Sequence, residues 1–192
     1  MFFQKFLIIL LVLNIIFGLV NATNFVRNTA GPWAGYIATD YYNAPATTYN
    51  FTSINGSWIV QAALPTNGSS YGSQWIGLGG FQNSGINQHA LLQIGTQSNY
   101  VCLVLNFDCS NSYDAFYETL GTSLNPSTQL ISGLNIRPGD KIFTSITLTS
   151  SSNCIIKFFS CWKLFINDST KGESISPIYV NFYPNTTSAA CP

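Results

Sequence analysis

The chain has 192 residues, of which 7% are charged: seven Lys and Arg, seven Asp and Glu, and a single His. Its apolar content of 46% is that of a globular protein, whereas soluble domains usually carry about 25% charged residues. Zero net charge without a basic cluster argues against a nucleic-acid partner, because binding phosphates needs many Lys and Arg side chains. One His and seven acidic residues leave little material for a metal site, so we expect no metal and no cofactor.

The first 22 residues differ from the rest of the chain. Lys5 gives a short positive start, residues 6–20 form an apolar run, and Ala22 offers a small residue at a cleavage site. The run is shorter than the ~20 apolar residues of a membrane-spanning helix, so it predicts a signal peptide over residues 1–22 that is removed on export. An uncleaved anchor is the alternative. We expect residues 23–192 to form one secreted, monomeric domain without membrane contact after this cleavage.

From residue 23 onward the sequence shows the two-residue alternation of β-strands and no persuasive 3.6-residue stripe. The clearest run places Ile142, Ile146 and Leu148 on one face. Pairs such as Asn67-Gly68 and Pro138-Gly139 mark turns between the strands. The pattern indicates an all-β fold, a two-sheet antiparallel β-sandwich of the concanavalin-like jelly-roll type. In chain order, the expected strands are residues 51–60, 74–78, 90–94, 100–107, 113–118, 142–149, 155–166 and 178–183.

Five cysteines fit an exported chain, in which disulfides persist. Cys102 and Cys109 are seven residues apart, as are Cys154 and Cys161, and both spacings suit a bridge between neighbouring strands. Cys191 is left over beside the last residue. Zinc binding is the competing interpretation, but zinc sites favour closer Cys pairs together with His, so we expect disulfides.

Standard catalytic templates are mostly missing from the sequence. A Ser or Cys nucleophile would need His89 as its base, and a lone His is more often a surface residue or one satisfied in the fold. Asp114 and Glu118 share a face of one expected strand, but four residues along a strand separate their Cα atoms by about 13 Å. They therefore do not form the opposed carboxylate pair of a glycosidase.

An ordered series of short motifs runs through most of the chain. Its central members are Trp75-Ile76-Gly77-Leu78-Gly79-Gly80, Leu91-Leu92-Gln93-Ile94-Gly95 and Tyr113-Asp114-Ala115-Phe116-Tyr117-Glu118. Its outer members are Pro32-Trp33-Ala34-Gly35-Tyr36, Phe51-x-x-Ile54-x-Gly56-Ser57-Trp58, Pro138-Gly139-Asp140 and Asn167-x-x-Thr170-x-Gly172. In this order the motifs resemble the glutamic peptidases (eqolisins, peptidase family G1, formerly A4), which are secreted endopeptidases that work in acid.

The resemblance implies a hydrolytic mechanism. In the family a Glu carboxylate acts as general base on a water that attacks the scissile carbonyl, and a Gln amide donates to the developing oxyanion. Gln93 matches that catalytic glutamine, Glu118 a carboxylate of the substrate cleft, and Trp75 a residue near the substrate. On a strand, Leu92 and Ile94 would face the core while Gln93 points into an open concave face. Without the resemblance, a surface glutamine is the simpler interpretation of Gln93.

Two departures from the family pattern bear on activity. Gly79 replaces an Asp of the family that lines the cleft. The catalytic Glu lies in a late Ala-Glu-Trp segment that nothing here matches, and the sequence stops at residues 188–192, about where that strand should begin. Glu173, the only glutamate besides Glu118, follows a turn and is expected to be solvated. We therefore expect a domain that is truncated at its C-terminus and lacks the catalytic Glu.

The leading interpretation is a secreted acid endopeptidase of the glutamic peptidase type, with a protein or peptide substrate, Gln93 present and the base missing. The alternative is a non-catalytic secreted β-sandwich that binds carbohydrate or a cell surface, which the aromatic content of 15% supports. A chain with few carboxylates has few salt bridges to lose as the pH falls, so its low charge suits an acidic extracellular environment.

Overall fold

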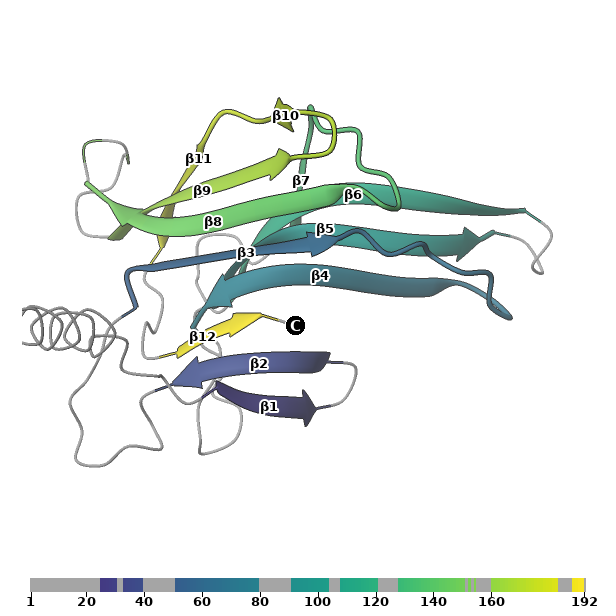
Figure 1. Cartoon of the computed structure of the whole chain (residues 1–192), viewed down its shortest axis with the longest axis horizontal. Coiled ribbons are helices and arrows are strands. Elements are labelled where there is room, and N and C mark those ends of the chain that lie inside the picture. Colours follow the sequence, from purple (N-terminus) through teal and green to yellow (C-terminus); the bar gives the residue numbers. More distant parts are fainter. Residues whose placement is uncertain are drawn as a thin grey trace, which may run out of the picture.

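The computed structural model describes residues 25–30, 33–39, 51–79, 91–103, 108–120, 128–150, 152, 154, 160–182 and 188–191. Twelve strands in these residues form two antiparallel sheets, and Figure 1 shows most of them running along the long axis of the molecule. The expected all-β class with two antiparallel sheets is therefore confirmed. In this described part, no helix is long and apolar enough to cross a membrane. The expected signal peptide over residues 1–22 and His89 lie outside the described residues.

The larger sheet has seven strands in the order β1-β2-β12-β4-β5-β6-β7. Although β12 is the last strand of the chain, it lies between β2 and β4 and pairs with both (Figure 1). It thereby joins the first two strands to the rest of the sheet. The bounds are β1 (Phe25–Ala30), β2 (Trp33–Thr39), β4 (Ser70–Leu78), β5 (Leu91–Cys102), β6 (Cys109–Leu120), β7 (Thr128–Ile131) and β12 (Ser188–Cys191).

The smaller sheet has five strands, with the path β10-β9-β8-β3 and with β11 also paired to β9. Its β8 follows the expected alternation at first, since Ile142 and Ile146 are fully buried while Phe143 is exposed. Leu148, expected on the same face as Ile142, is instead 40% exposed near the end of the strand. The bounds are β3 (Ser53–Ile59), β8 (Lys141–Thr149), β9 (Ser160–Asp168), β10 (Glu173–Ser174) and β11 (Ile178–Phe182).

Strand β5 differs from the expectation, because the two strands expected at residues 90–94 and 100–107 are one continuous strand. Residues 95–99 between them are Gly, Thr, Gln, Ser and Asn, and most of these are poor strand formers that interrupt the apolar pattern. Both neighbours nevertheless pair along this stretch, where Gln97 is the partner of Ser73 in β4 and of Asp114 in β6. Pairing on both edges thus outweighs the weak local propensity.

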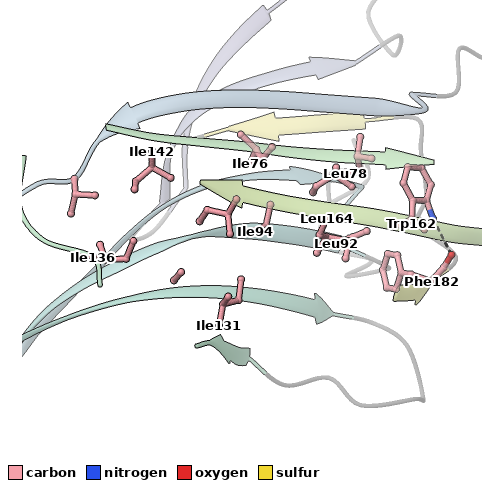
Figure 2. Close-up of a cluster of buried hydrophobic side chains, with 14 residues drawn as sticks. Ile76, Leu78, Leu92, Ile94, Ile131, Ile136, Ile142, Trp162, Leu164 and Phe182 are labelled. Carbon is pink, nitrogen blue, oxygen red and sulfur yellow. Dashed lines mark hydrogen bonds between the residues drawn. The ribbon is translucent and has the colours of Figure 1, made fainter. Parts of the chain in front are cut away.

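The core lies between the two sheets (Figure 2). The larger sheet contributes Leu92 and Ile94 from β5, and the smaller sheet faces them with side chains such as Leu164, all fully buried. Burying one such side chain contributes about 1.5–3 kcal/mol. The sheets also approach closely where a Cβ added at Gly56 would lie 2.7 Å from Ile76 Cγ2, which explains the glycine in β3.

Two tryptophans of the core also make hydrogen bonds. Trp58 packs against the core from β3, and its Nε1 donates to Thr96 Oγ1 of β5 at 2.9 Å, which ties the two sheets together. Trp162 of β9 is fully buried, and its Nε1 donates to the carbonyl oxygen of Phe182 at 3.1 Å (Figure 2). Buried indole N–H groups need such partners, because an unpaired buried donor is costly.

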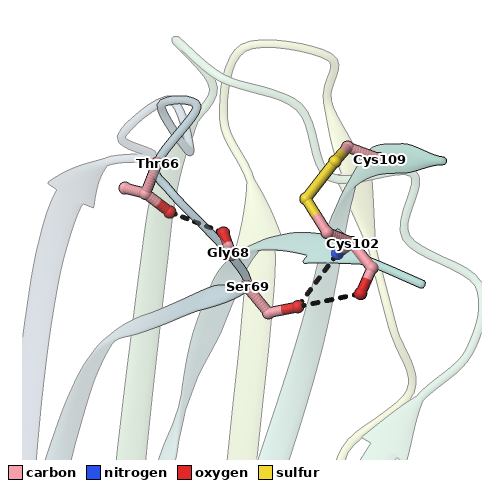
Figure 3. The surroundings of a disulfide bond; sticks show 5 residues. All are labelled: Thr66, Gly68, Ser69, Cys102 and Cys109. Atoms are coloured by element: carbon pink, nitrogen blue, oxygen red, sulfur yellow. Dashed lines mark hydrogen bonds between the residues drawn. A yellow bond between two sulfur atoms is a disulfide. The ribbon is translucent and has the colours of Figure 1, made fainter. Parts of the chain in front are cut away.

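Both expected disulfides are present. Cys102 at the end of β5 and Cys109 at the start of β6 are bonded and are also register partners, so the bridge closes the turn between these strands. The Ser69 hydroxyl accepts from Cys102 N at 2.9 Å and lies 3.3 Å from Cys102 O, which attaches the start of β4 to the same corner (Figure 3). The second bridge joins Cys154 to Cys161 in β9.

Lys171, Asp140 and Asp168 form a charged cluster at one end of the smaller sheet. Lys171 Nζ lies 2.5 Å from Asp140 Oδ2 and 3.1 Å from Asp168 Oδ2, and both carboxylates are buried. Backbone amides add to it, since Arg137 N donates to Asp140 Oδ2 and Thr170 N to Asp168 Oδ1. The motifs at residues 138–140 and 167–172 therefore meet in space, and their role here is structural.

The cluster shifts the ionisation of two of its members. Burial alone would raise the pKa of Asp168, but hydrogen bonds from Lys171 and from the Thr170 backbone outweigh burial and hold the pKa below its usual 3.8. Burial alone would lower the pKa of Lys171, but Asp140 and Asp168 raise it above 10.5. The stabilisation from Asp168 is thus complete above the unfolded-state pKa and is lost as pH falls through the lower folded-state pKa. The stabilisation that Lys171 contributes is lost only as the pH rises beyond 10.5.

The two disulfides provide a stability prediction. Each closes a loop with a sequence separation of 7, so the loop-closure model gives each bridge the same value of about 2–3 kcal/mol. Replacing Cys102 and Cys109 with Ser should therefore lower the free energy of unfolding in urea by this amount. Replacing Cys154 and Cys161 with Ser should have an equal effect. If the two variants lose free energies of unfolding that differ by more than about 1 kcal/mol, the disulfides do not stabilise the protein only by constraining its unfolded state.

The charged cluster predicts a particular pH dependence. At neutral pH, Asp168→Asn should lower the free energy of unfolding by about 1.5–3 kcal/mol, because Lys171 loses a charged partner. The difference from the unmodified protein should shrink as the pH falls below 3.8, where Asp168 itself becomes protonated. Urea unfolding at a series of pH values measures this difference. Asp108→Asn, which changes an exposed carboxylate, is the control. If the loss of unfolding free energy caused by Asp168→Asn persisted in acid, the prediction would be contradicted.

Candidate active site

The register of five neighbouring strands places one row of residues across the larger sheet. Gln93 of β5 is paired with Glu118 of β6 on one side and with Gly77 of β4 on the other. Gly77 is in turn paired with Ala190 of β12, and Glu118 with Thr128 of β7. Since paired residues of adjacent strands share a face, this row brings Gln93 and Glu118, the two polar residues expected at the site, side by side.

Gln93 lies on the face of β5 away from the core, because Leu92 and Ile94 occupy the core face with no exposed surface. This orientation agrees with the expected alternation. Gln93 itself is only 7% exposed, however, so its surroundings are more enclosed than the open face we expected. Neighbouring side chains crowd this row: a Cβ added at Gly77 would lie 2.8 Å from Leu91 Cδ1 and 3.0 Å from Trp75 Cζ3.

The side chains of Gln93 and Glu118 contact each other directly. Gln93 Nε2 donates a hydrogen bond to Glu118 Oε2. The other carboxylate oxygen, Glu118 Oε1, accepts from Thr128 Oγ1 at 2.9 Å. Each oxygen of Glu118 therefore has a donor, which holds the carboxylate in one orientation beside the amide. A glutamine amide carries two N–H donors, and within the described part of the chain one of those of Gln93 is used, by Glu118.

A second pair of the same kind lies four residues along the two strands. Gln97 Nε2 of β5 donates to Asp114 Oδ2 of β6 at 3.1 Å. The sequence interpretation did not find Gln97. The sequence did contain a signal for this pair, because Gln93 and Gln97 are separated by the same four residues as Asp114 and Glu118. An antiparallel register that pairs Gln93 with Glu118 must therefore also pair Gln97 with Asp114. Asp114 and Glu118 thus each bind their own amide, in agreement with the separation expected between them.

Trp75 lies on the row next to that of Gln93. Its register partner is Gly95 of β5, and Gly95 is paired with Phe116 of β6. Gly95 has no room for a side chain, since an added Cβ would lie 2.2 Å from Gln74 O and 2.6 Å from Trp75 Cβ. The glycine of the Gln-x-Gly motif therefore leaves room for the backbone of β4 and for Trp75, which its register places on the face that carries Gln93.

Other residues singled out from the sequence lie elsewhere. Glu173 is on β10 in the smaller sheet, where its Oε2 accepts from Asn135 N at 3.3 Å, so it is not part of the Gln93 row. Gly79 has a positive φ of 86°, which glycine adopts without strain. Among the described residues, no group of three or more His, Cys, Asp and Glu side chains could hold a metal ion.

The end of the chain contributes a strand to this region. Residues 188–191 pair with β2 and β4, and Ala190 is the partner of Gly77. With neighbouring strands about 4.8 Å apart, Ala190 lies two strands, or about 10 Å, from Gln93 across the backbone of Gly77. The fold therefore supplies a strand position on the side of Gln93 opposite to Glu118.

Comparison with known proteins agrees with these features. A family model described as the peptidase A4 family matches residues 31–176, more than half of the chain. Among solved structures, the crystal structure of scytalido-glutamic peptidase with a transition state analog inhibitor is similar, with a TM-score of 0.52 and 21% sequence identity. The match covers 88% of this chain and 65% of the scytalido-glutamic peptidase chain. This chain therefore spans just under two thirds of the length of that peptidase. At this identity the likeness is one of fold. Comparison with the curated proteins gives no significant match.

Proposed function

The chain belongs to the peptidase A4 family, and we propose that the face around Gln93 binds a peptide with a backbone carbonyl directed at the Gln93 amide. Family and fold indicate a protein of the glutamic peptidase type. The observation that carries the proposal is the buried Gln93 amide, held by Glu118 in the motif that carries the family's catalytic glutamine.

Gln93 suits the role of oxyanion donor for a physical reason. Its amide is neutral at every pH, so it still donates a hydrogen bond in strong acid, where hydrolysis by this family takes place. A donor that is already oriented stabilises the charge on a tetrahedral intermediate without reorganising. Glu118 provides that orientation by accepting one N–H of Gln93, and Thr128 holds Glu118 in turn. Trp75, one row away, offers an aromatic surface for a substrate side chain.

Hydrolysis also needs a general base to take a proton from the attacking water. In the peptidases that the chain resembles, this base is the Glu of an Ala-Glu-Trp segment. We propose that Ala189-Ala190-Cys191 occupies the place of that segment, with Ala190 at the position of the base. The support is its register, since Ala190 is aligned with Gln93 across Gly77. An alanine cannot accept a proton, so the proposed function of this chain is to bind peptides without rapid turnover.

The disulfides and the family fit an extracellular protein. We propose that it acts there in an acidic environment on protein or peptide ligands. The acidic setting follows from the family resemblance and from the low charge of the sequence, of which 7% is charged.

The proposed ligand can be tested without catalysis. A peptide in which a tetrahedral alcohol replaces one backbone carbonyl should bind, and Gln93→Ala should weaken its binding between about two- and tenfold, the value of one neutral hydrogen bond. Gln97→Ala is the matched control, because it removes the same kind of amide–carboxylate pair from the same face of β5. Isothermal titration calorimetry in acid measures both. Equal losses in the two variants would contradict a special role for Gln93.

The position of the missing base gives a gain-of-function prediction. Ala190→Glu should create acid proteolysis of a denatured protein substrate. Adding Gln93→Ala should then lower kcat by about 100- to 1,000-fold, as for loss of one oxyanion donor. Gln97→Ala in the same background should leave kcat within about a few fold. A folded Ala190→Glu protein without activity would refute the assignment of position 190.

A further inference from the structure

Three Asn-x-Ser sequences that could accept an N-linked glycan lie within the described residues. The structure gives their asparagines different surroundings, and only one of the three lies on a sheet edge beside an exposed aromatic ring. They are Asn55-Gly56-Ser57 in β3, Asn67-Gly68-Ser69 before β4, and Asn167-Asp168-Ser169 at the end of β9.

Asn55 lies on the outer face of β3, an edge strand. β3 ends the strand path of the smaller sheet, and in the described part of the chain β8 is the strand that pairs with it. Along β3, Ile54 and Gly56 face the core, whereas Asn55 and Ser57 are exposed. A strand edge with free backbone groups can pair with another chain, and proteins usually protect such edges.

The outer face beside Asn55 carries an exposed aromatic ring. Asn55 is paired with Ser145 of β8, and Ser57 with Phe143, so Phe143 is the diagonal neighbour of Asn55 on the same face. Phe143 is 37% exposed although it lies in the middle of the sheet. A sugar ring has an apolar C–H face, and packing it on Phe143 would remove apolar surface from water.

We propose that Asn55 carries an N-linked oligosaccharide that covers Phe143 and protects the edge of β3 that no described strand pairs with. In the transfer, the Asn55 side-chain nitrogen attacks the anomeric carbon of a lipid-pyrophosphate-linked oligosaccharide. A C–N bond forms, the bond from that carbon to the pyrophosphate oxygen breaks, the amide loses a proton, and the lipid pyrophosphate leaves. The modification requires passage through a glycosylating secretory pathway, and it is independent of peptide binding at Gln93.

Asn167 provides the contrast. It lies inside the sheet, paired with Phe143 of β8 and with Ser174 of β10, and its Oδ1 is buried. The middle residue of its sequence, Asp168, is fully buried in the cluster with Lys171. Asn167 is flanked by β8 and β10 and is followed by the buried Asp168 of the charged cluster, so a glycan on Asn167 would disturb the packing there, and the Asn167 sequence should stay unmodified in the folded protein.

Peptide mapping tests the modification. The full chain is secreted from yeast behind the host's own leader and treated with a peptide N-glycosidase in ¹⁸O water, which converts each modified Asn into a labelled Asp. Asn55 should be labelled and Asn167 should not. Ser57→Ala, which leaves Asn55 in place, should remove one glycan mass, and the matched Ser169→Ala should remove none. A secreted, folded protein with unlabelled Asn55, or with labelled Asn167, would overturn the proposal.

Sedimentation velocity tests the protective role. Native protein from which the glycans are removed enzymatically, and the Ser57→Ala variant, should both self-associate more than Ser169→Ala does. Phe143→Thr in the Ser57→Ala background should reduce this association. If the deglycosylated protein and Ser57→Ala stay as monomeric as Ser169→Ala, the glycan does not cover this face and that part of the proposal fails.

Discussion

The register of β5 between β4 and β6 is the constraint on which both the core and the candidate site depend. Leu92 and Ile94 are completely buried on one face of β5, and Gln93 and Gln97 bind carboxylates on the other. A slip by one residue would exchange these faces, exposing both apolar side chains at about 1.5–3 kcal/mol each and burying the two amides. The apolar core therefore determines which carboxylate each glutamine meets, although it touches neither pair.

The protein holds its carboxylates in two chemically different ways. In the smaller sheet, Asp140 and Asp168 depend on Lys171, and this ion pairing requires ionised carboxylates. On the candidate site face, Glu118 and Asp114 bind the neutral amides of Gln93 and Gln97. These two carboxylates therefore have neutral hydrogen-bond donors as partners rather than a cation. The site face thus holds its acidic side chains without the positive charge on which the smaller sheet depends.

Sequence patterns predicted those parts of the fold that repeat over several residues or join close neighbours in the chain. The alternation from Ile142 onward and the two seven-residue Cys spacings are of this kind. The continuity of β5 was missed, because pairing on both sides stabilises a polar stretch that is weak on its own. The Lys171 cluster could not be predicted, since it forms only when two distant turns meet. Strand β12, only four residues long, is too short to show a pattern.

Gly77 is the residue that connects the donor Gln93 to the strand position at Ala190. Its lack of a side chain leaves room for Trp75 and Leu91, which a Cβ at this position would displace. Gln93 and Ala190 are therefore separated by one strand, about 10 Å between their backbones, and the side chains of Trp75 and Leu91 lie over the glycine between them. On the proposed assignment, the fold already provides the donor, its orienting carboxylate and the strand opposite. The site then differs from a hydrolytic one in a single respect, because the alanine at position 190 cannot accept a proton as a glutamate there would.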